Sequence, residues 1–234
     1  MKNGSDLSLL DNPIWNSLTT QHAGFAVGGV LARRYRSEIG PLTGLREPSG
    51  EALAELAAIV PLGDISVLFL EERIAFPAGW QILREGALVQ MLCPSPPAVV
   101  EASEEMIVLG PEDNAEMVAL ATLTEPGPFR DGTATLGGFV GVRVGGRLAA
   151  MAGQRLSPAG SREVSAVCTH PEFRGRGFAR ALVARVSRDI FAAGEVPFLS
   201  AMATNVGAIR VYEQVGFHLR RELELAVVRP ALGR

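Results

Sequence analysis

Two hydrophobic periods alternate in the second half of the chain. Short apolar runs rich in β-branched residues are typical of strands, whereas apolar residues three or four apart are typical of helices. The pattern predicts strands at residues 106–109, 139–144, 147–153, 164–169, 197–201 and 219–228, and helices that start at residue 111 and span 177–193 and 206–215. Gly145 and Gly146 are expected to form the two-residue turn of a hairpin.

Patterning in the first half is less regular. Asn12 and Ser49 each precede a segment with helical features, and an Asn or Ser side chain in that position caps a helix. Short helices are therefore expected from Pro13 and from Gly50. Strands are predicted at residues 31–39, 65–70, 80–84 and 87–93, and the last two should pair around Glu85 and Gly86.

A proline-rich segment from Cys93 to Pro97 separates the two halves. Proline lacks a backbone donor and favours an extended shape, so this segment should continue neither a helix nor a sheet. We interpret it as a connector between an N-terminal lobe, residues 1–98, and a second domain, residues 103–234. A tight loop within a single domain is the alternative.

Composition narrows the class of protein. Hydrophobic residues make up 47% of the chain and charged residues 20%, which is typical of a globular protein with a sizeable core. A net charge of −3 supplies no basic field for nucleic acid or anionic lipid. The N-terminus does not resemble a signal peptide, and Gly, Pro or charged residues interrupt every apolar run before it could span a membrane. We therefore expect a cytoplasmic protein without a nucleic-acid or membrane partner.

Cysteine and histidine are scarce. The two cysteines, Cys93 and Cys168, form no CxxC pair, and the three histidines lie far apart. Neither a zinc site nor a disulfide framework is predicted, and reduced thiols agree with a cytoplasmic location.

The segment after the predicted strand 164–169 has the features of an anion-binding turn. Pro171 enforces a turn, and Gly175 and Gly177 let the backbone approach an anion closely before a helix begins. The unpaired N–H groups at a helix start suit a phosphate. The helix is supported by an apolar stripe of Phe178, Leu182, Val186 and Ile190.

Two phosphate-binding patterns fit this turn poorly. A Walker loop needs Lys and Ser or Thr after its second glycine, where this chain has Phe178 and Ala179. The dinucleotide pattern needs a third glycine, and Arg180 occupies that position. Instead, Arg174-x-x-Gly177-x-Ala179, preceded by His170-Pro171-Glu172-Phe173, resembles the coenzyme A signature of the GNAT acyltransferase superfamily.

A second motif strengthens this resemblance. Asn205 should cap the helix at 206–215, and Tyr212 follows seven residues later on the same helical face. Together with Gly216 and Phe217, these residues resemble the closing motif of the superfamily, in which Asn contacts coenzyme A and Tyr protonates the departing thiolate.

The resemblance covers residues 105–228 and implies an α+β fold. The expected architecture is the GNAT acyl-CoA N-acyltransferase fold, in which helices flank a mixed, mostly antiparallel sheet that splays open to admit the pantetheine arm. A smaller, degenerate α/β lobe would precede it. Acetyl-CoA is the implied cosubstrate. The implied coenzyme-binding residues are Val167, Cys168 and Thr169 at the strand edge, Arg174, Gly175, Arg176, Gly177, Phe178, Ala179 and Arg180 around the pyrophosphate, and Asn205.

The resemblance also implies the catalytic groups. A neutral amine would attack the thioester directly, a backbone N–H near Val167 would polarise its carbonyl, and Tyr212 would protonate the sulfur. Ser200 occupies the position where several family members have a glutamate base. Glu163 is the candidate base, with a solvated structural carboxylate, a water relay or proton loss to solvent as alternatives. Cys168 is not expected to be a nucleophile.

The first hundred residues contain no recognised chemical motif. His22 and Trp15 are expected to pack or cap rather than catalyse. The chain resembles the two-lobed, glycine N-acyltransferase-like branch with an FR47-like C-terminal domain, so the first lobe would build part of the acceptor pocket or an interface, which leaves a homodimer open. The expected reaction is acetylation of a primary amine on a small molecule or amino acid. Protein or peptide acetylation and an acyl-CoA-binding module without turnover are the alternatives.

Overall fold

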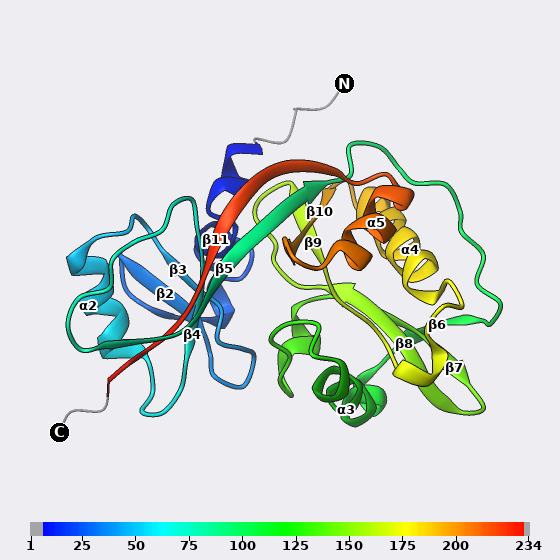
Figure 1. Cartoon of the computed structure of the whole chain (residues 1–234), viewed down its shortest axis with the longest axis horizontal. Helices are drawn as coiled ribbons and strands as arrows, with labels where there is room; N and C mark the ends of the chain where they lie inside the picture. The colour runs from blue at the N-terminus through cyan, green and yellow to red at the C-terminus, as the bar shows by residue number, and fades with distance from the viewer. Residues whose placement is uncertain (1–6, 232–234) are drawn as a thin grey trace.

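The computed structural model describes residues 7–231, and its centre is an eight-stranded sheet (Figure 1). The strand order is β4 (Ser66–Leu70), β11 (His218–Pro230), β5 (Trp80–Leu92), β10 (Val196–Met202), β9 (Ser161–Thr169), β8 (Arg147–Gln154), β7 (Phe139–Val144) and β6 (Met106–Leu109). Neighbouring strands are antiparallel except β9 and β10, which are parallel. The expected mixed, mostly antiparallel sheet of an α+β fold is confirmed.

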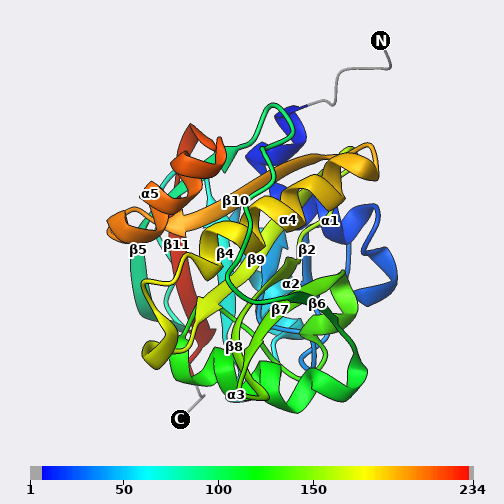
Figure 2. The ribbon, with the colours of Figure 1, turned by 90° about the vertical axis from the view of Figure 1, so that its right-hand side faces the viewer.

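Helices cover both faces of this sheet. Along β8, Ala150 and Ala152 pack into the cluster that contains α4 (Phe178–Ala192) and α5 (Val206–Val215), whereas Met151 packs into the cluster that contains α3 (Asn114–Thr124). Successive strand residues point to opposite faces, so α3 lies on the face opposite α4 and α5. Figure 2 shows α4 in front of β9 and β10. The predicted apolar stripe of α4 is confirmed, since all four of its side chains are at most 2% exposed.

The N-terminal half adds two helices and a small second sheet. Its elements are α1 (Pro13–Thr19), α2 (Gly50–Ile59), β1 (Ala26–Gly28), β2 (Ala32–Tyr35) and β3 (Thr43–Leu45). Asn12 and Ser49 cap the two helices as expected, because their side chains accept hydrogen bonds from the N–H groups of Trp15 and Ala52. Short 3-10 turns lie at Leu7–Asp11, Ala23–Phe25, Pro111–Asp113, Thr133–Leu136 and Pro171–Phe173.

The prediction of a strand pair around Glu85 and Gly86 is wrong. These residues lie inside β5, which continues straight from Trp80 to Leu92. It pairs with β11 from Trp80–Pro230 to Leu92–His218. Because β11 is equally long, β5 continues through Gly86 without a turn. The predicted strand at 31–39 is also shorter, since β2 ends at Tyr35 and the N–H groups of Ile39 and Gly40 turn back to the Arg36 carbonyl.

The sheet is shared across the proline-rich segment. β4 and β5 precede Cys93, yet β5 lies between β10 and β11. Phe198 of β10 packs against α1, while its neighbour Leu199 packs on the α4 face, so the N-terminal half covers the face opposite α4. The division into residues 1–98 and 103–234 stays a prediction. Within residues 7–231, no helix is both long and apolar enough to cross a bilayer.

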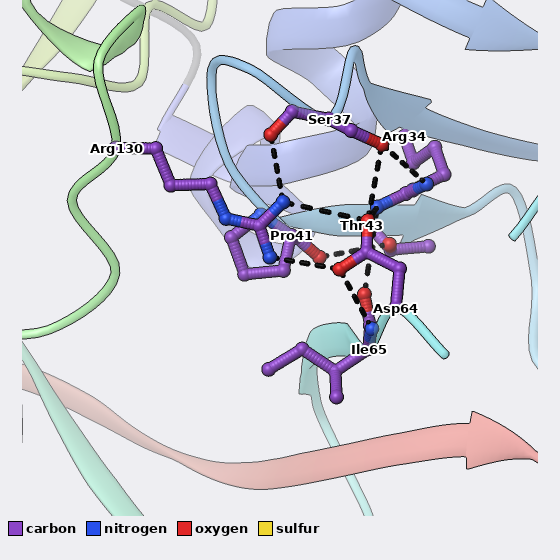
Figure 3. Close-up of polar contacts among 7 residues, drawn as sticks. All are labelled: Arg34, Ser37, Pro41, Thr43, Asp64, Ile65 and Arg130. Carbon is purple, nitrogen blue, oxygen red and sulfur yellow. Dashed lines mark hydrogen bonds and ion pairs between the residues drawn. The ribbon is translucent and has the colours of Figure 1, made fainter. Parts of the chain in front are cut away.

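A cluster of charged side chains ties the two halves together (Figure 3). The Asp64 carboxylate accepts hydrogen bonds from Arg34 Nη2 at 2.6 Å, from Arg130 Nη2 at 2.8 Å and from the Ile65 N–H at 2.8 Å. Arg130 follows α3, and its Nη1 also donates to the Ser37 carbonyl at 2.7 Å. Burial raises the pKa of Asp64, but the hydrogen bonds outweigh it and hold that pKa well below the usual range. Asp64 therefore carries a full negative charge between two arginines.

Replacing Asp64 with asparagine is expected to lower the free energy of unfolding by about 3 kcal/mol, because it leaves the buried guanidinium of Arg34 without a counter-charge. Urea unfolding at neutral pH measures the effect. Glu38→Gln is the matched control, since its pair with Arg36 is solvent-exposed and should contribute less than about 1 kcal/mol.

The loss of stability caused by Asp64→Asn is expected to depend on pH. The folded pKa of Asp64 is depressed, so its stabilising effect is complete above the unfolded value and is lost as the pH falls below 3.8. The stability difference between wild type and Asp64→Asn should therefore shrink in acid. An undiminished difference at that pH would contradict the assigned charge.

Candidate active site

The site begins where two parallel strands separate. β9 and β10 pair at only three positions, from Ser161–Val196 to Glu163–Phe198. Beyond these positions the strands diverge, and the edge of β9 from Val164 to Thr169 faces the gap. The expected splayed sheet is confirmed, and the gap opens toward the start of α4 and α5.

A cavity of about 710 Å³ occupies this gap. It is lined by all the residues expected to hold the coenzyme, which are Val167, Cys168, Thr169, Arg174, Gly175, Arg176, Gly177, Phe178, Ala179, Arg180 and Asn205, and by the expected acid Tyr212. Thr124, Glu125 and Pro126, at the end of α3, line it as well. The structure thus brings together two motifs that lie some thirty residues apart in the chain.

A β-bulge shapes the strand edge of the cavity. On β9, Ala166 and Val167 lie opposite the single residue Ala152 of β8, because the register shifts between Met151–Cys168 and Gly153–Ser165. Ala166 has a φ of 52°, in the left-handed region. A bulge re-aims the residues around it, and here Val167 packs toward α4 while Ala166 and Cys168 pack toward α3. No residue type in this strand marks the bulge, so sequence reasoning missed it.

The turn before α4 has the open backbone expected of an anion cradle. Gly175 and Gly177 both have a φ of 78°, and a Cβ built at either would meet no described heavy atom within 4 Å. Left-handed backbone of this kind strongly favours glycine. The free N–H groups of the first turn of α4 and the guanidinium of Arg174 therefore border an open, positively charged part of the cavity. These features fit the pyrophosphate of coenzyme A.

Tyr212, which also lines the cavity, is held in a protonated state. Asn205 caps α5 by accepting a hydrogen bond from the Ala208 N–H at 3.2 Å, which fixes the helix that carries Tyr212. Burial raises the pKa of Tyr212 to about 12, and the Coulomb effects of Cys168 and Glu163 act in the same direction. Tyr212 therefore keeps its proton at neutral pH and can donate it.

The candidate base does not reach the cavity. The Glu163 side chain is fully buried, and it accepts hydrogen bonds from Arg155 Nε at 2.8 Å and Nη2 at 3.0 Å. The expectation of a solvated carboxylate at a strand start is wrong, because Glu163 lies where β9 is paired on both sides. Both carboxylate oxygens of Glu163 are hydrogen-bonded to a guanidinium. Glu163 is therefore placed to stabilise the strand fork, the point where β9 and β10 separate, rather than to bind an amine.

Cys168 and Ser200, two other side chains near the strand fork, are also unsuited to act as a general base. Burial raises the pKa of Cys168 to about 11, even though hydrogen bonds from Thr124 and Met151 oppose this shift. Cys168 is therefore a thiol, in agreement with its expected lack of nucleophilic function. The Ser200 hydroxyl oxygen is buried without a hydrogen-bond partner among the described residues.

The N-terminal half contributes no lining residue to this cavity within the described chain, since the lining residues begin at Thr124. It contacts the elements around the cavity instead, through the Arg130–Asp64 pair after α3 and through Val89 and Met91 of β5, which pack in the cluster that contains Tyr212. His22 is buried and packs as expected, with Nδ1 2.8 Å from the Tyr35 hydroxyl. Among residues 7–231, no group of three or more His, Cys, Asp or Glu side chains could hold a metal ion.

The comparisons with known proteins agree with this geometry. The FR47-like protein family matches residues 139–226. The chain is 40% identical to a GNAT-family protein from Novosphingobium aromaticivorans DSM 12444, whose crystal structure matches with a TM-score of 0.88 over 95% of this chain and 99% of that one. The chain therefore belongs to the GNAT superfamily.

More distant structures share the fold. A GCN5-related N-acetyltransferase from Kribbella flavida is 18% identical, with a TM-score of 0.64 over 94% of this chain and 95% of that one. A GCN5-related N-acetyltransferase-like protein from Streptococcus suis 89/1591 is 14% identical, with a TM-score of 0.63 over 92% of both chains. No curated protein sequence matches this chain. Membership of the glycine N-acyltransferase-like branch stays a prediction.

Proposed function

We propose that the protein is an N-acetyltransferase that transfers the acetyl group of acetyl-CoA to a primary amine of a small molecule or amino acid. The observation that supports this most is the single cavity lined by the Arg174–Ala179 signature, the β9 edge and Tyr212. Membership of the GNAT superfamily supports it independently. Acetyl is the expected group because nothing in the sequence favours a longer chain.

Each part of the cavity has a proposed task. The β9 edge at Val167, Cys168 and Thr169 would pair with the pantetheine amides. The first turn of α4 and Arg174 would hold the pyrophosphate through N–H groups and charge. When bound, the cosubstrate supplies the thioester that the amine attacks.

The chain's own groups then assist the transfer. The N–H of Val167, which is part of the bulge, would donate to the carbonyl oxygen as negative charge develops there. As the new C–N bond forms and the C–S bond breaks, the electron pair leaves on sulfur, and the Tyr212 hydroxyl donates its proton to it.

Calorimetry with acetyl-CoA and a thiol-release assay against a panel of amines test the proposal. Saturable binding followed by amine-dependent thiol release is expected. Undetectable binding would remove the coenzyme assignment. Binding without release for any amine would favour a module that binds acyl-CoA without turnover, a reading to which Ser200 and the buried Glu163 lend some support. Thiol release with peptides but with no small amine would indicate that the acceptor is a protein or peptide.

A further inference from the structure

One acidic side chain stands out in the cavity wall. Glu125 directly follows α3 and is the single carboxylate among the described residues that line the cavity, whereas Arg174, Arg176 and Arg180 line it with positive charge. Glu125 is exposed, and the described part of the chain offers it no ion-pair partner. A carboxylate in this cavity would repel a coenzyme phosphate, so the Glu125 side chain is suited to a cationic ligand instead.

The backbone of Glu125 is strained. Its φ of 49° and ψ of 53° are left-handed, and its N–H donates to the Ala121 carbonyl at 2.8 Å to close the helix. Glycine is the usual residue at such a helix end. Only two non-glycine residues within 7–231 have a positive φ, and these are Glu125 and Ala166 of the bulge. Both adjoin this cavity, and strained residues of this kind concentrate at functional sites.

Glu125 directly follows the helix that packs against the β9 edge of the cavity. Leu120 and Ala121 of α3 pack in one buried cluster with Cys168 of β9, and Thr124 and Cys168 both line the cavity. Thr124 itself is fixed because its hydroxyl donates to the Leu120 carbonyl at 2.6 Å. Glu125 therefore lies on the α3 side of the cavity, whereas Arg174, Arg176 and Arg180 belong to the turn before α4 and to its first turn.

The N-terminal half holds this loop in place. The Thr133 hydroxyl donates to the Ile39 carbonyl at 2.6 Å, and the Gly132 N–H donates to the Glu38 carbonyl at 2.8 Å. The Arg130–Asp64 pair adds a charged contact to the same region (Figure 3). These contacts fix the far end of the loop that begins at Glu125, which limits the movement of its backbone before a ligand arrives and lowers the entropic cost of binding.

We propose that Glu125 binds the ammonium group of the acceptor and takes the first of its protons. This inference rests on the proposed acetyltransferase function and names its acceptor class, a cationic primary amine. The carboxylate takes one proton from the ammonium, which leaves the neutral amine to attack the thioester carbonyl. The amide nitrogen gives its second proton to the Tyr212 phenolate left after protonation of sulfur. Exposed Glu125 then releases its proton to solvent, so one proton is released per turnover.

Glu125→Gln tests the proposal, because it keeps the size of the side chain and removes its charge. We expect kcat/KM for cationic amines to fall about 10- to 100-fold, the range expected when a charged hydrogen bond is lost. The KM for acetyl-CoA should not change. Transfer to hydroxylamine, which is uncharged at neutral pH, should fall much less than transfer to alkylamines.

Two further variants separate charge from backbone effects. Glu125→Gly should give the same loss with cationic amines without a lower Tm, since glycine adopts the left-handed backbone without strain. Glu112→Gln, an exposed acid before α3 that lies outside the cavity lining, should keep wild-type kinetics.

The outcomes distinguish the two proposals. Wild-type protein that releases no thiol with any amine contradicts the enzymatic function itself. Normal wild-type turnover with an unchanged Glu125→Gln variant contradicts only the role of Glu125. An equal loss with hydroxylamine and alkylamines would also contradict it, because that result would show a structural defect rather than a lost charge.

Discussion

Replacing Tyr212 with phenylalanine is expected to lower kcat by about 100-fold or more while acetyl-CoA still binds, since general acid catalysis typically contributes at least that factor. The substitution removes the proton donor but keeps the ring, which packs near Phe217 in the core. Steady-state kinetics with calorimetry on the same preparation separates the two quantities. An unchanged kcat would remove Tyr212 from the acid role.

The other tyrosine provides the matched control. Tyr35→Phe removes a buried hydroxyl that contacts His22 in the N-terminal half, outside the cavity lining. It should lower the free energy of unfolding by about 1–3 kcal/mol, because a buried partner loses its hydrogen bond, but leave kcat close to that of wild type. Similar losses of kcat in both variants would indicate a general effect of the lost hydroxyl on folding.

The protonation of Tyr212 adds a pH criterion. Because burial raises the pKa of Tyr212 to about 12, the wild-type enzyme should not lose activity through this group at moderately alkaline pH. An alkaline decline of kcat well below pH 12 that is absent from Tyr212→Phe would contradict the raised pKa.

Replacing Gly177 with glutamate is expected to weaken acetyl-CoA binding by roughly 1000-fold. A carboxylate about 4 Å from a phosphate oxygen costs about 4 kcal/mol at an effective dielectric constant of about 20, and every 1.4 kcal/mol is about a factor of ten. The left-handed backbone at Gly177 adds strain to any side chain. Calorimetry measures the loss, and Arg174→Ala in the same chain should abolish detectable binding.

Gly194 gives a close control for this substitution. It follows the other end of α4, has a φ of 79° against 78° for Gly177, and also has open space at its Cβ position among the described atoms. Gly194→Glu introduces the same charge and the same strain away from the cavity. It should therefore bind acetyl-CoA like wild type, whereas equal losses in the two variants would show that the turn before α4 does not hold the coenzyme.

Local sequence determined most of the helices and the coenzyme signature. The stripe through Phe178 and Leu182 follows from helical period alone, and the caps Asn12, Ser49 and Asn205 each accept from an N–H group three residues further on. Gly175 and Gly177 indicate an open backbone for the same reason, because a left-handed φ angle depends on the type of the residue that adopts it. Interactions between residues a few positions apart depend only on the local sequence, so they can be predicted from a single sequence.

Long-range pairing decided the rest. β5 passes straight through Gly86 because β11, more than a hundred residues away, pairs with it along its full length. Glu163 became a buried partner of Arg155 rather than a free carboxylate because β8, β9 and β10 meet around it. The bulge at Ala166 arises from the register between β8 and β9. Glu125 lines the cavity because α3 ends beside β9. The sequence thus determined the anion-binding turn and its resemblance to a coenzyme A signature, whereas only the tertiary structure decided which carboxylate lines the cavity, since burial and strand register depend on distant partners.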